Sequence, residues 1–184
     1  AQPLQARLDA APADGAIDEL VARAEDHLAA NPEDGRGWDV LAPIYHRMGR
    51  FADAKTAWRN AISLLGRSAA RETGLGEAIA SAQGGLIVAE AREAFERALA
   101  LEPRNPKVRF LLGAALAQEG RHEEAASAWR AMLPDLEPDS PWRDAVMQAL
   151  AQRDGKTNAG SGEKELRALA KDHGKAALKE IEGR

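Results

Sequence analysis

Apolar side chains recur every three or four residues along most of the chain, which is the spacing of amphipathic α-helices. Alanine dominates the apolar residues and β-branched residues are sparse, so the composition favours closely packed helices over strands. The segment 17–30 shows the helical spacing before any longer pattern begins, at Ile17, Leu20, Val21, Ala24 and Leu28. The sequence therefore predicts an all-α fold.

A longer pattern is superimposed on the helical one. Nine residues follow the spacing large-x-x-Leu-small-x-x-Tyr and then Ala-x-x-x-aromatic-x-x-Ala: Trp38, Leu41, Ala42, Tyr45, Gly49, Phe51, Ala54, Trp58 and Ala61. This is the tetratricopeptide-repeat signature. Its second half recurs at Ala91 and Phe95, and again about 34 residues later at Ala125 and Trp129. The sequence predicts a right-handed superhelix of about three helix pairs, with leading and closing helices.

The spacing also predicts where the parts of the chain begin and end. The repeats are placed near 35–68, 72–105 and 106–139, with a three-residue offset between the first two. The predicted parts are an N-terminal extension over 1–15, a repeat domain over 16–153, a flexible linker over 154–162 and a helical tail over 163–184. Ser140 and Pro141 are expected to cap and start the closing helix, which ends near Gln152. Because the tail ends in a common engineered protease-cleavage sequence, Ile181-Glu182-Gly183-Arg184, it is either native or added.

Individual positions have expected roles. The small residue in each first helix lets the second helix approach closely. Gly49 and Gly120 are expected in left-handed turns between the two helices of a pair. Gly74 and Gly76 lie inside the first helix of the middle repeat, where each costs about 1 kcal/mol relative to alanine. We therefore expect this helix to be the loosest of the array.

The first helix of each pair lines the concave face of such an array, so that face is the expected binding surface. Counting from the repeat frame, its predicted residues are Arg36, Asp39, Pro43, His46, Arg47, Gly76, Ala80, Gln83, Lys107, Phe110, Ala114, Ala117 and Gln118. The face suits an amphipathic helix or an extended peptide. Phe110 either contacts the bound peptide or packs under the neighbouring helix. Arg36, Arg47 and Lys107 are more simply explained as solvated charges.

Nothing in the sequence points to chemistry. The four histidines lie on four different predicted helices without the paired spacing of metal ligands: His27, His46, His122 and His173. There is no cysteine to act as a nucleophile and no serine in a Gly-x-Ser-x-Gly elbow. The net charge of −4 disfavours a nucleic-acid partner. The sequence predicts no enzymatic activity, no metal or cofactor, and no small-molecule substrate.

Three stretches carry a resemblance to a known family: residues 27–66, residues 90–103 and residues 110–133. The segment from Leu20 to Trp142 resembles the periplasmic repeat domain of the CcmI/CycH-type cytochrome c biogenesis proteins. Gly35-Arg36-Gly37-Trp38 followed by Leu41-Ala42-Pro43 is the most particular part, since a proline inside the first helix is unusual in ordinary repeats.

The resemblance implies a specific function. Members of the family bind the C-terminal helix of haem-free cytochrome c and present it to the membrane proteins of the haem-ligation complex. It further implies a periplasmic location, with a membrane anchor elsewhere in the full-length protein. The alternative is a scaffold of tetratricopeptide repeats that assembles protein complexes unrelated to haem.

Overall fold

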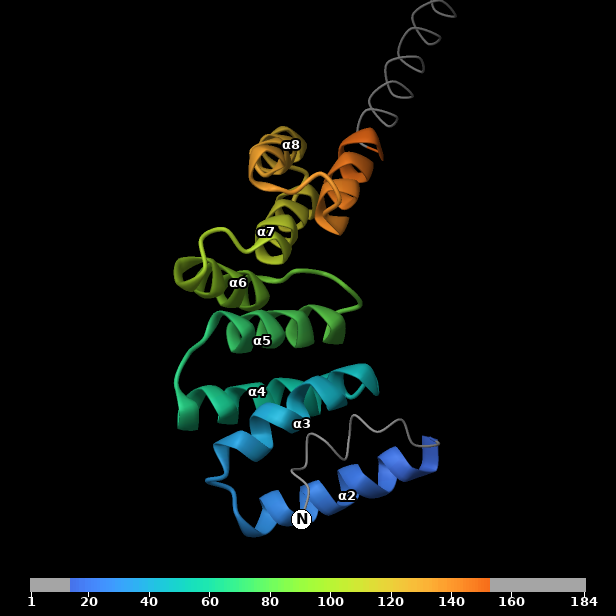
Figure 1. The fold of residues 1–184 in the computed structure, drawn as a ribbon, viewed down its shortest axis with the longest axis vertical. Helices are drawn as coiled ribbons and strands as arrows, with labels where there is room; N and C mark the ends of the chain where they lie inside the picture. The colour runs from blue at the N-terminus through green and yellow to red at the C-terminus, as the bar shows by residue number, and fades with distance from the viewer. Residues whose placement is uncertain (1–13, 153–184) are drawn as a thin grey trace, which may run out of the picture. The chain divides into compact units, whose positions relative to one another are not determined.

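The computed structural model describes residues 14–152, and every regular element in that range is helical (Figure 1). The elements are α2 (Asp14–Ala30), α3 (Gly35–Arg47), α4 (Phe51–Leu65), α5 (Ala69–Ala82), α6 (Ala89–Leu101), α7 (Pro106–Gln118), α8 (His122–Arg130), the 3-10 helix η1 (Leu133–Asp135) and a helix over 141–152. The predicted all-α fold is confirmed. The linker over 154–162, the tail over 163–184 and nearly all of the extension over 1–15 lie outside the described residues.

The chain divides into two compact units, the first ending at Ala128 and the second beginning at Trp129. In the first unit each helix from α2 to α7 packs against the next one, and α3 also contacts α5. Figure 1 shows α3 beside α4 and α5 beside α6 in this stack. The contact between α3 and α5 means that the first helices of successive pairs lie next to each other.

The second unit contains η1 and the helix over 141–152. The Ser140 hydroxyl accepts a hydrogen bond from the Trp142 amide at 3.3 Å, which confirms the predicted helix start. The Arg143 guanidinium donates to the carbonyl oxygens of Leu133 at 3.2 Å and Leu136 at 3.4 Å. These bonds tie the helix back to η1 and the residue that follows it.

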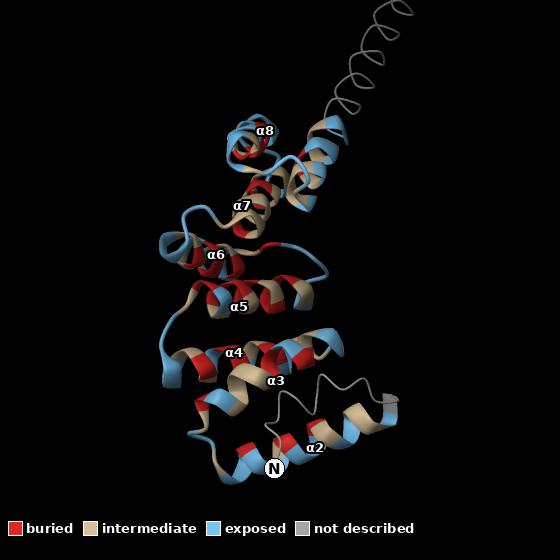
Figure 2. Ribbon diagram, viewed as in Figure 1, coloured by how far each residue is buried: buried red, intermediate tan, exposed pale blue. Residues whose placement is uncertain are grey.

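Side chains at the signature positions form the core of the first unit. Leu41, Ala42 and Tyr45 of α3 are buried together with Ala54 and Trp58 of α4. Burying one large aliphatic or aromatic side chain stabilises a fold by about 1.5–3 kcal/mol, so these repeated positions hold the stack together. Figure 2 shows that buried residues also run along α5 and α6.

Polar contacts fasten the leading helix to the first pair. The Tyr45 hydroxyl donates to a Glu25 carboxylate oxygen of α2 at 2.8 Å. Arg50 bonds the same carboxylate at 2.7 Å, and its guanidinium carbon lies 4.5 Å from the centroid of the Tyr45 ring. Burial, reinforced by Glu25, raises the pKa of Tyr45 above its ordinary value of 10.0, so the hydroxyl keeps the proton that it donates even in mildly alkaline solution.

The turn between the helices of a pair requires a left-handed residue, as predicted for Gly49 and Gly120. Their φ angles are 74° and 78°. At such angles a Cβ atom costs roughly 1 kcal/mol, which glycine avoids.

The glycines of α5 correct the expectation that this helix is loose. A Cβ atom on Gly74 would lie 2.4 Å from the Trp58 ring, and one on Gly76 would lie 2.5 Å from the Phe95 ring. Phe95 is fully buried, and most of α5 is buried with it. The two glycines therefore make room for aromatic rings from both neighbouring helices, and their propensity cost is offset by packing.

The structure also moves the start of the middle repeat. The helix begins at Ala69, after the Ser68 hydroxyl accepts a hydrogen bond from the Arg71 amide at 3.2 Å, so the predicted start at residue 72 is wrong. The extra three residues lie in the turn over 83–88, which is longer by three than the turn over 48–50. Gly76 of α5 thus corresponds to Ala42 of α3, the small residue where two helices approach.

Candidate functional site

The corrected frame defines one surface formed by the first helices of the pairs, which we call the first-helix face. It consists of Arg36, Asp39, Pro43, His46 and Arg47 on α3, then Ala70, Thr73, Glu77, Ala80 and Ser81 on α5, then Lys107, Phe110, Ala114, Ala117 and Gln118 on α7. All three helices lie in the first unit.

Polar contacts between neighbouring first helices show that these residues share a face. The Arg71 guanidinium of α5 donates twice to the Asp39 carboxylate of α3, at 2.9 Å from both Nε and Nη2. These hydrogen bonds raise the pKa of Arg71. Such fork-like pairing fixes both side chains in orientation.

Two further contacts continue along the face. The Nε2 atom of His46 lies 2.9 Å from the Ser81 hydroxyl, and the His46 ring lies 5.2 Å from that of Phe51, centroid to centroid. Lys107 of α7 pairs with Glu77 of α5 at 2.5 Å. Hydrogen bonds and ion pairs between side chains therefore join the three helices that form the first-helix face.

Exposure differs sharply along this face. On α3 three of its residues are exposed to solvent: Arg36, Pro43 and Arg47. On α5 only Ala70 is exposed, while Thr73 and Ala80 are buried. The Thr73 hydroxyl oxygen is buried without a hydrogen-bond partner. Of these two helices, α3 thus presents more accessible side chains to a partner of the face than α5 does.

Several sequence-predicted site residues have other roles. Gly76 is wrong as a surface residue, because it is buried against the Phe95 ring of α6. Ala80 belongs to the face but is buried, so it forms no accessible floor. Gln83 is exposed and caps the C-terminus of α5 at the start of the long turn, where its backbone N–H donates to the Ala80 carbonyl at 3.0 Å, so it lies beyond the first-helix face of the corrected frame.

The side chain of Gln118 forms hydrogen bonds with the same turn. Its amide oxygen accepts from the Ile87 N–H at 2.8 Å, and its amide nitrogen donates to the Gly85 carbonyl at 3.0 Å. The side chain predicted to contact a ligand therefore holds the α5–α6 turn against the end of α7. Phe110, Ala114 and Ala117 are half-buried on α7.

The residues that the sequence interpretation missed are Thr73, Glu77 and Ser81 of α5, together with Arg71. A signal for them existed. Leu75, Gly76 and Ile79 repeat the spacing of Leu41, Ala42 and Tyr45, which places the frame of α5 three residues earlier than counting back from Ala91 and Phe95 does.

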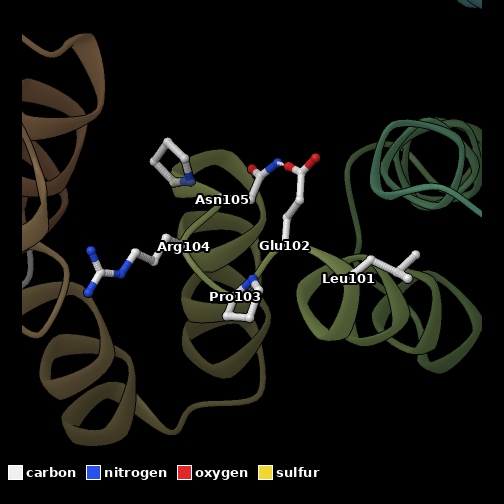
Figure 3. A pocket seen from close by; sticks show the side chains of 6 residues that line it. Leu101, Glu102, Pro103, Arg104 and Asn105 are labelled. Carbon is white, nitrogen blue, oxygen red and sulfur yellow. Dashed lines mark hydrogen bonds between the residues drawn. The ribbon is translucent and has the colours of Figure 1, made fainter.

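Within residues 14–152 no group of three His, Asp or Glu side chains is arranged to hold a metal ion. A depression lies at the α6–α7 turn, lined by residues 101–106 (Figure 3). There the Asn105 side chain accepts from the Val108 amide at 3.1 Å and donates to Glu102 at 2.9 Å. These polar groups are already engaged in the hydrogen bonds that cap the N-terminus of α7. Arg104 points away from them in Figure 3.

Similarity to known proteins decides the family. The model of the cytochrome c-type biogenesis protein H tetratricopeptide-repeat domain matches residues 10–143. The chain belongs to this family. It is 48% identical over 143 residues to the cytochrome c-type biogenesis protein CycH of Bradyrhizobium diazoefficiens, covering 78% of this chain and 39% of the relative. The CycH protein of Rhizobium meliloti is 49% identical over 152 residues, covering 83% and 39%.

Both relatives are named for cytochrome c-type biogenesis, and the chain spans about two fifths of their length. The fold also matches a solved structure, the Hsp90 co-chaperone Cns1 of Saccharomyces cerevisiae. The TM-score is 0.64 at 16% identity, covering 79% of this chain and 47% of Cns1. That likeness concerns the repeat fold alone. In the described residues of the present chain, no helix is both long enough and apolar enough to cross a bilayer.

Proposed function

We propose that this domain is a non-catalytic peptide-binding chaperone of c-type cytochrome maturation. It holds the C-terminal helix of apocytochrome c on the first-helix face and hands it to the membrane proteins of the haem-ligation complex. The domain acts in the periplasm, attached to a membrane through another part of the full-length protein.

The observation that carries this proposal is the exposed side of α3 in a CycH-family domain. Arg36, Pro43 and Arg47 form a row of exposed residues on one helix face. The neighbouring first helices are fixed by the bonds from Asp39 to Arg71 and from Glu77 to Lys107. A rigid surface loses little conformational entropy on binding, which suits capture of a helix in a fixed orientation.

The substrate must be recognised before haem is attached. This requires the apolar side of the C-terminal helix to be accessible in apocytochrome and covered in holocytochrome, so that a chaperone binding that side distinguishes the two forms. Apolar contacts supply affinity in helix-in-groove recognition, and the half-buried Phe110 of α7 offers the largest apolar side chain of the first-helix face.

Isothermal titration of the intact chain with a synthetic peptide of the apocytochrome C-terminal helix tests the proposal. We expect saturable binding of the peptide and of full apocytochrome, and none of holocytochrome. Equal binding of apo and holo forms would support a scaffold without a role in haem attachment. Absence of any saturable binding would refute the chaperone function.

Phe110→Ala sharpens the same test. Truncating an aromatic hot spot in an interface costs about 2 kcal/mol or more, so we expect the peptide affinity to fall at least about thirtyfold. Leu101→Ala is the matched control, because Leu101 is a large exposed side chain away from the first-helix face, at the end of α6. Circular dichroism of both variants verifies that the helices remain. Unchanged affinity in Phe110→Ala places the ligand elsewhere.

A further inference from the structure

The first-helix face carries two positive charges without partners. Arg36 and Arg47 are exposed, and neither has a carboxylate within ion-pair distance among residues 14–152. Elsewhere in the first unit arginines pair readily, as Arg50 does with Glu25 and Arg59 does with Glu90. Arg104, in the α6–α7 turn, is also unpaired within the described residues, but Arg36 and Arg47 are the ones that lie on the first-helix face. The chain as a whole has an acidic excess, with 29 Asp and Glu against 25 Lys and Arg.

The charged side chains Asp39, Glu77 and Lys107 of the face all have partners of opposite charge. Asp39 is bonded to Arg71, and Glu77 to Lys107. The unpaired charge of the face is therefore the positive charge of Arg36 and Arg47, in a molecule whose net charge is −4. A local positive surplus on a negative protein attracts a partner with acidic side chains at the matching places and repels basic ones.

The position of the two arginines sets the spacing of that partner. They lie eleven residues apart on one helix, which is close to three full turns, so both project on the same side. At a rise of about 1.5 Å per residue their Cα atoms are roughly 16 Å apart along the axis. Pro43 lies between them, is exposed, and presents an apolar ring.

We propose that the first-helix face selects a helix whose apolar stripe is flanked by two carboxylates about three turns apart, which bond Arg36 and Arg47. The occupant is a segment of another protein, and the inference rests on the proposed function because it specifies the chemistry of the same ligand. In this proposal Arg36 and Arg47 recognise the ligand. The simpler explanation from the sequence is that they are surface charges in contact with solvent alone.

The probe is the apocytochrome C-terminal-helix peptide, in which two surface positions eleven residues apart carry Glu, Gln or Lys. The intact chain is titrated with each version by calorimetry at low salt. Two exposed ion pairs contribute about 1 kcal/mol together, so the Glu version should bind about fivefold more tightly than the Gln version. The Lys version should bind most weakly, and added salt should remove the differences.

The double variant R36Q/R47Q should bind the Glu and Gln versions equally, whereas R104Q should keep the preference. Arg104 is a suitable control because it is exposed and lies in the α6–α7 turn. Equal affinity of the three versions for the unaltered chain, or a preference that survives in R36Q/R47Q, overturns the inference and leaves the proposed function intact. Failure of every peptide to bind overturns both.

Sedimentation of the intact chain identifies a competing occupant. Self-association that R36Q/R47Q abolishes would make a second copy of this chain the occupant, and would overturn the proposal. A monomer that binds the Glu version supports it.

Discussion

The helices α3 and α5 occupy the same place in successive repeats, but they differ in exposure. On the first-helix face α3 is exposed to solvent, whereas α5 is almost enclosed by its neighbours. On α3 the residues Arg36, Pro43 and Arg47 are exposed. On α5 the glycines Gly74 and Gly76 receive rings from α4 and α6, and even the hydroxyl of Thr73 is buried. Helices in the same position of successive repeats thus differ in exposure, since α3 keeps an exposed row of residues and α5 is packed between its neighbours.

The largest expected effect concerns the enclosed helix. Gly76→Ala places a Cβ atom in the space of the fully buried Phe95 ring, so overpacking should lower the free energy of unfolding by about 1–3 kcal/mol despite the better helix propensity of alanine. Urea denaturation measures the change.

Gly15→Ala is the control for this substitution. A Cβ atom on Gly15 of α2 meets nothing within 4 Å, so the free energy of unfolding should stay the same or rise by up to about 1 kcal/mol. If Gly76→Ala stabilises the protein as Gly15→Ala does, then α5 is not the tightly packed helix described above.

The N-terminal caps of α3 and α5 should respond differently to pH. The Asp34 carboxylate caps α3 by accepting from the Gly37 amide at 3.0 Å, and it lies 3.1 Å from His27 Nε2. The Gly37 bond, more than His27, lowers the pKa of Asp34 below 3.8. Asp34→Ala should cost about 1 kcal/mol at pH 7.

The pH dependence has a defined sign. Because the Asp34 carboxyl has a lower pKa in the folded state than in the unfolded state, its contribution is complete above the unfolded value near 3.8. It is lost as the pH falls through the folded value. The difference between the original chain and Asp34→Ala should therefore shrink in acid, whereas the cost of Ser68→Ala, the cap of α5, should stay constant. A constant Asp34→Ala cost down to pH 2 would contradict the charged cap.

The smallest effect concerns the buried hydroxyl of α5. Thr73→Val removes an oxygen that has no hydrogen-bond partner and keeps the shape of the side chain, so it should stabilise the protein by up to about 1 kcal/mol. Thr56→Val is the comparison on α4, where the hydroxyl is exposed and donates to the Ala52 carbonyl at 3.1 Å. Thermal unfolding that shows Thr73→Val to be the less stable variant would reveal a bond that the hydroxyl makes.

The comparison of α3 with α5 also explains what the sequence could predict. The positions of Trp38, Leu41 and Tyr45 depend only on local spacing, and the fold that they indicate was found. The role of Gly76 depends on Phe95, a ring nineteen residues later in the chain, and local propensity alone makes such a glycine look like a weak point.

The face residues show the same limit. Counting back from Ala91 assumed that every turn within a pair has the same length, and the longer turn over 83–88 broke that assumption. Which charges of the face remain unpaired depends on contacts such as that of Asp39 with Arg71, thirty-two residues apart. Spacing within one repeat carries no information about these contacts.

The most direct test of the account is a map of the ligand contact. In a nuclear magnetic resonance titration of the ¹⁵N-labelled chain with the apocytochrome C-terminal-helix peptide, the account predicts the largest amide shift changes on α3, between Arg36 and Arg47. Smaller changes are expected on α7 around Phe110. Largest changes on the second helices α4 and α6, or at the α6–α7 turn, would contradict the claim that the exposed side of α3 is where this domain holds its partner.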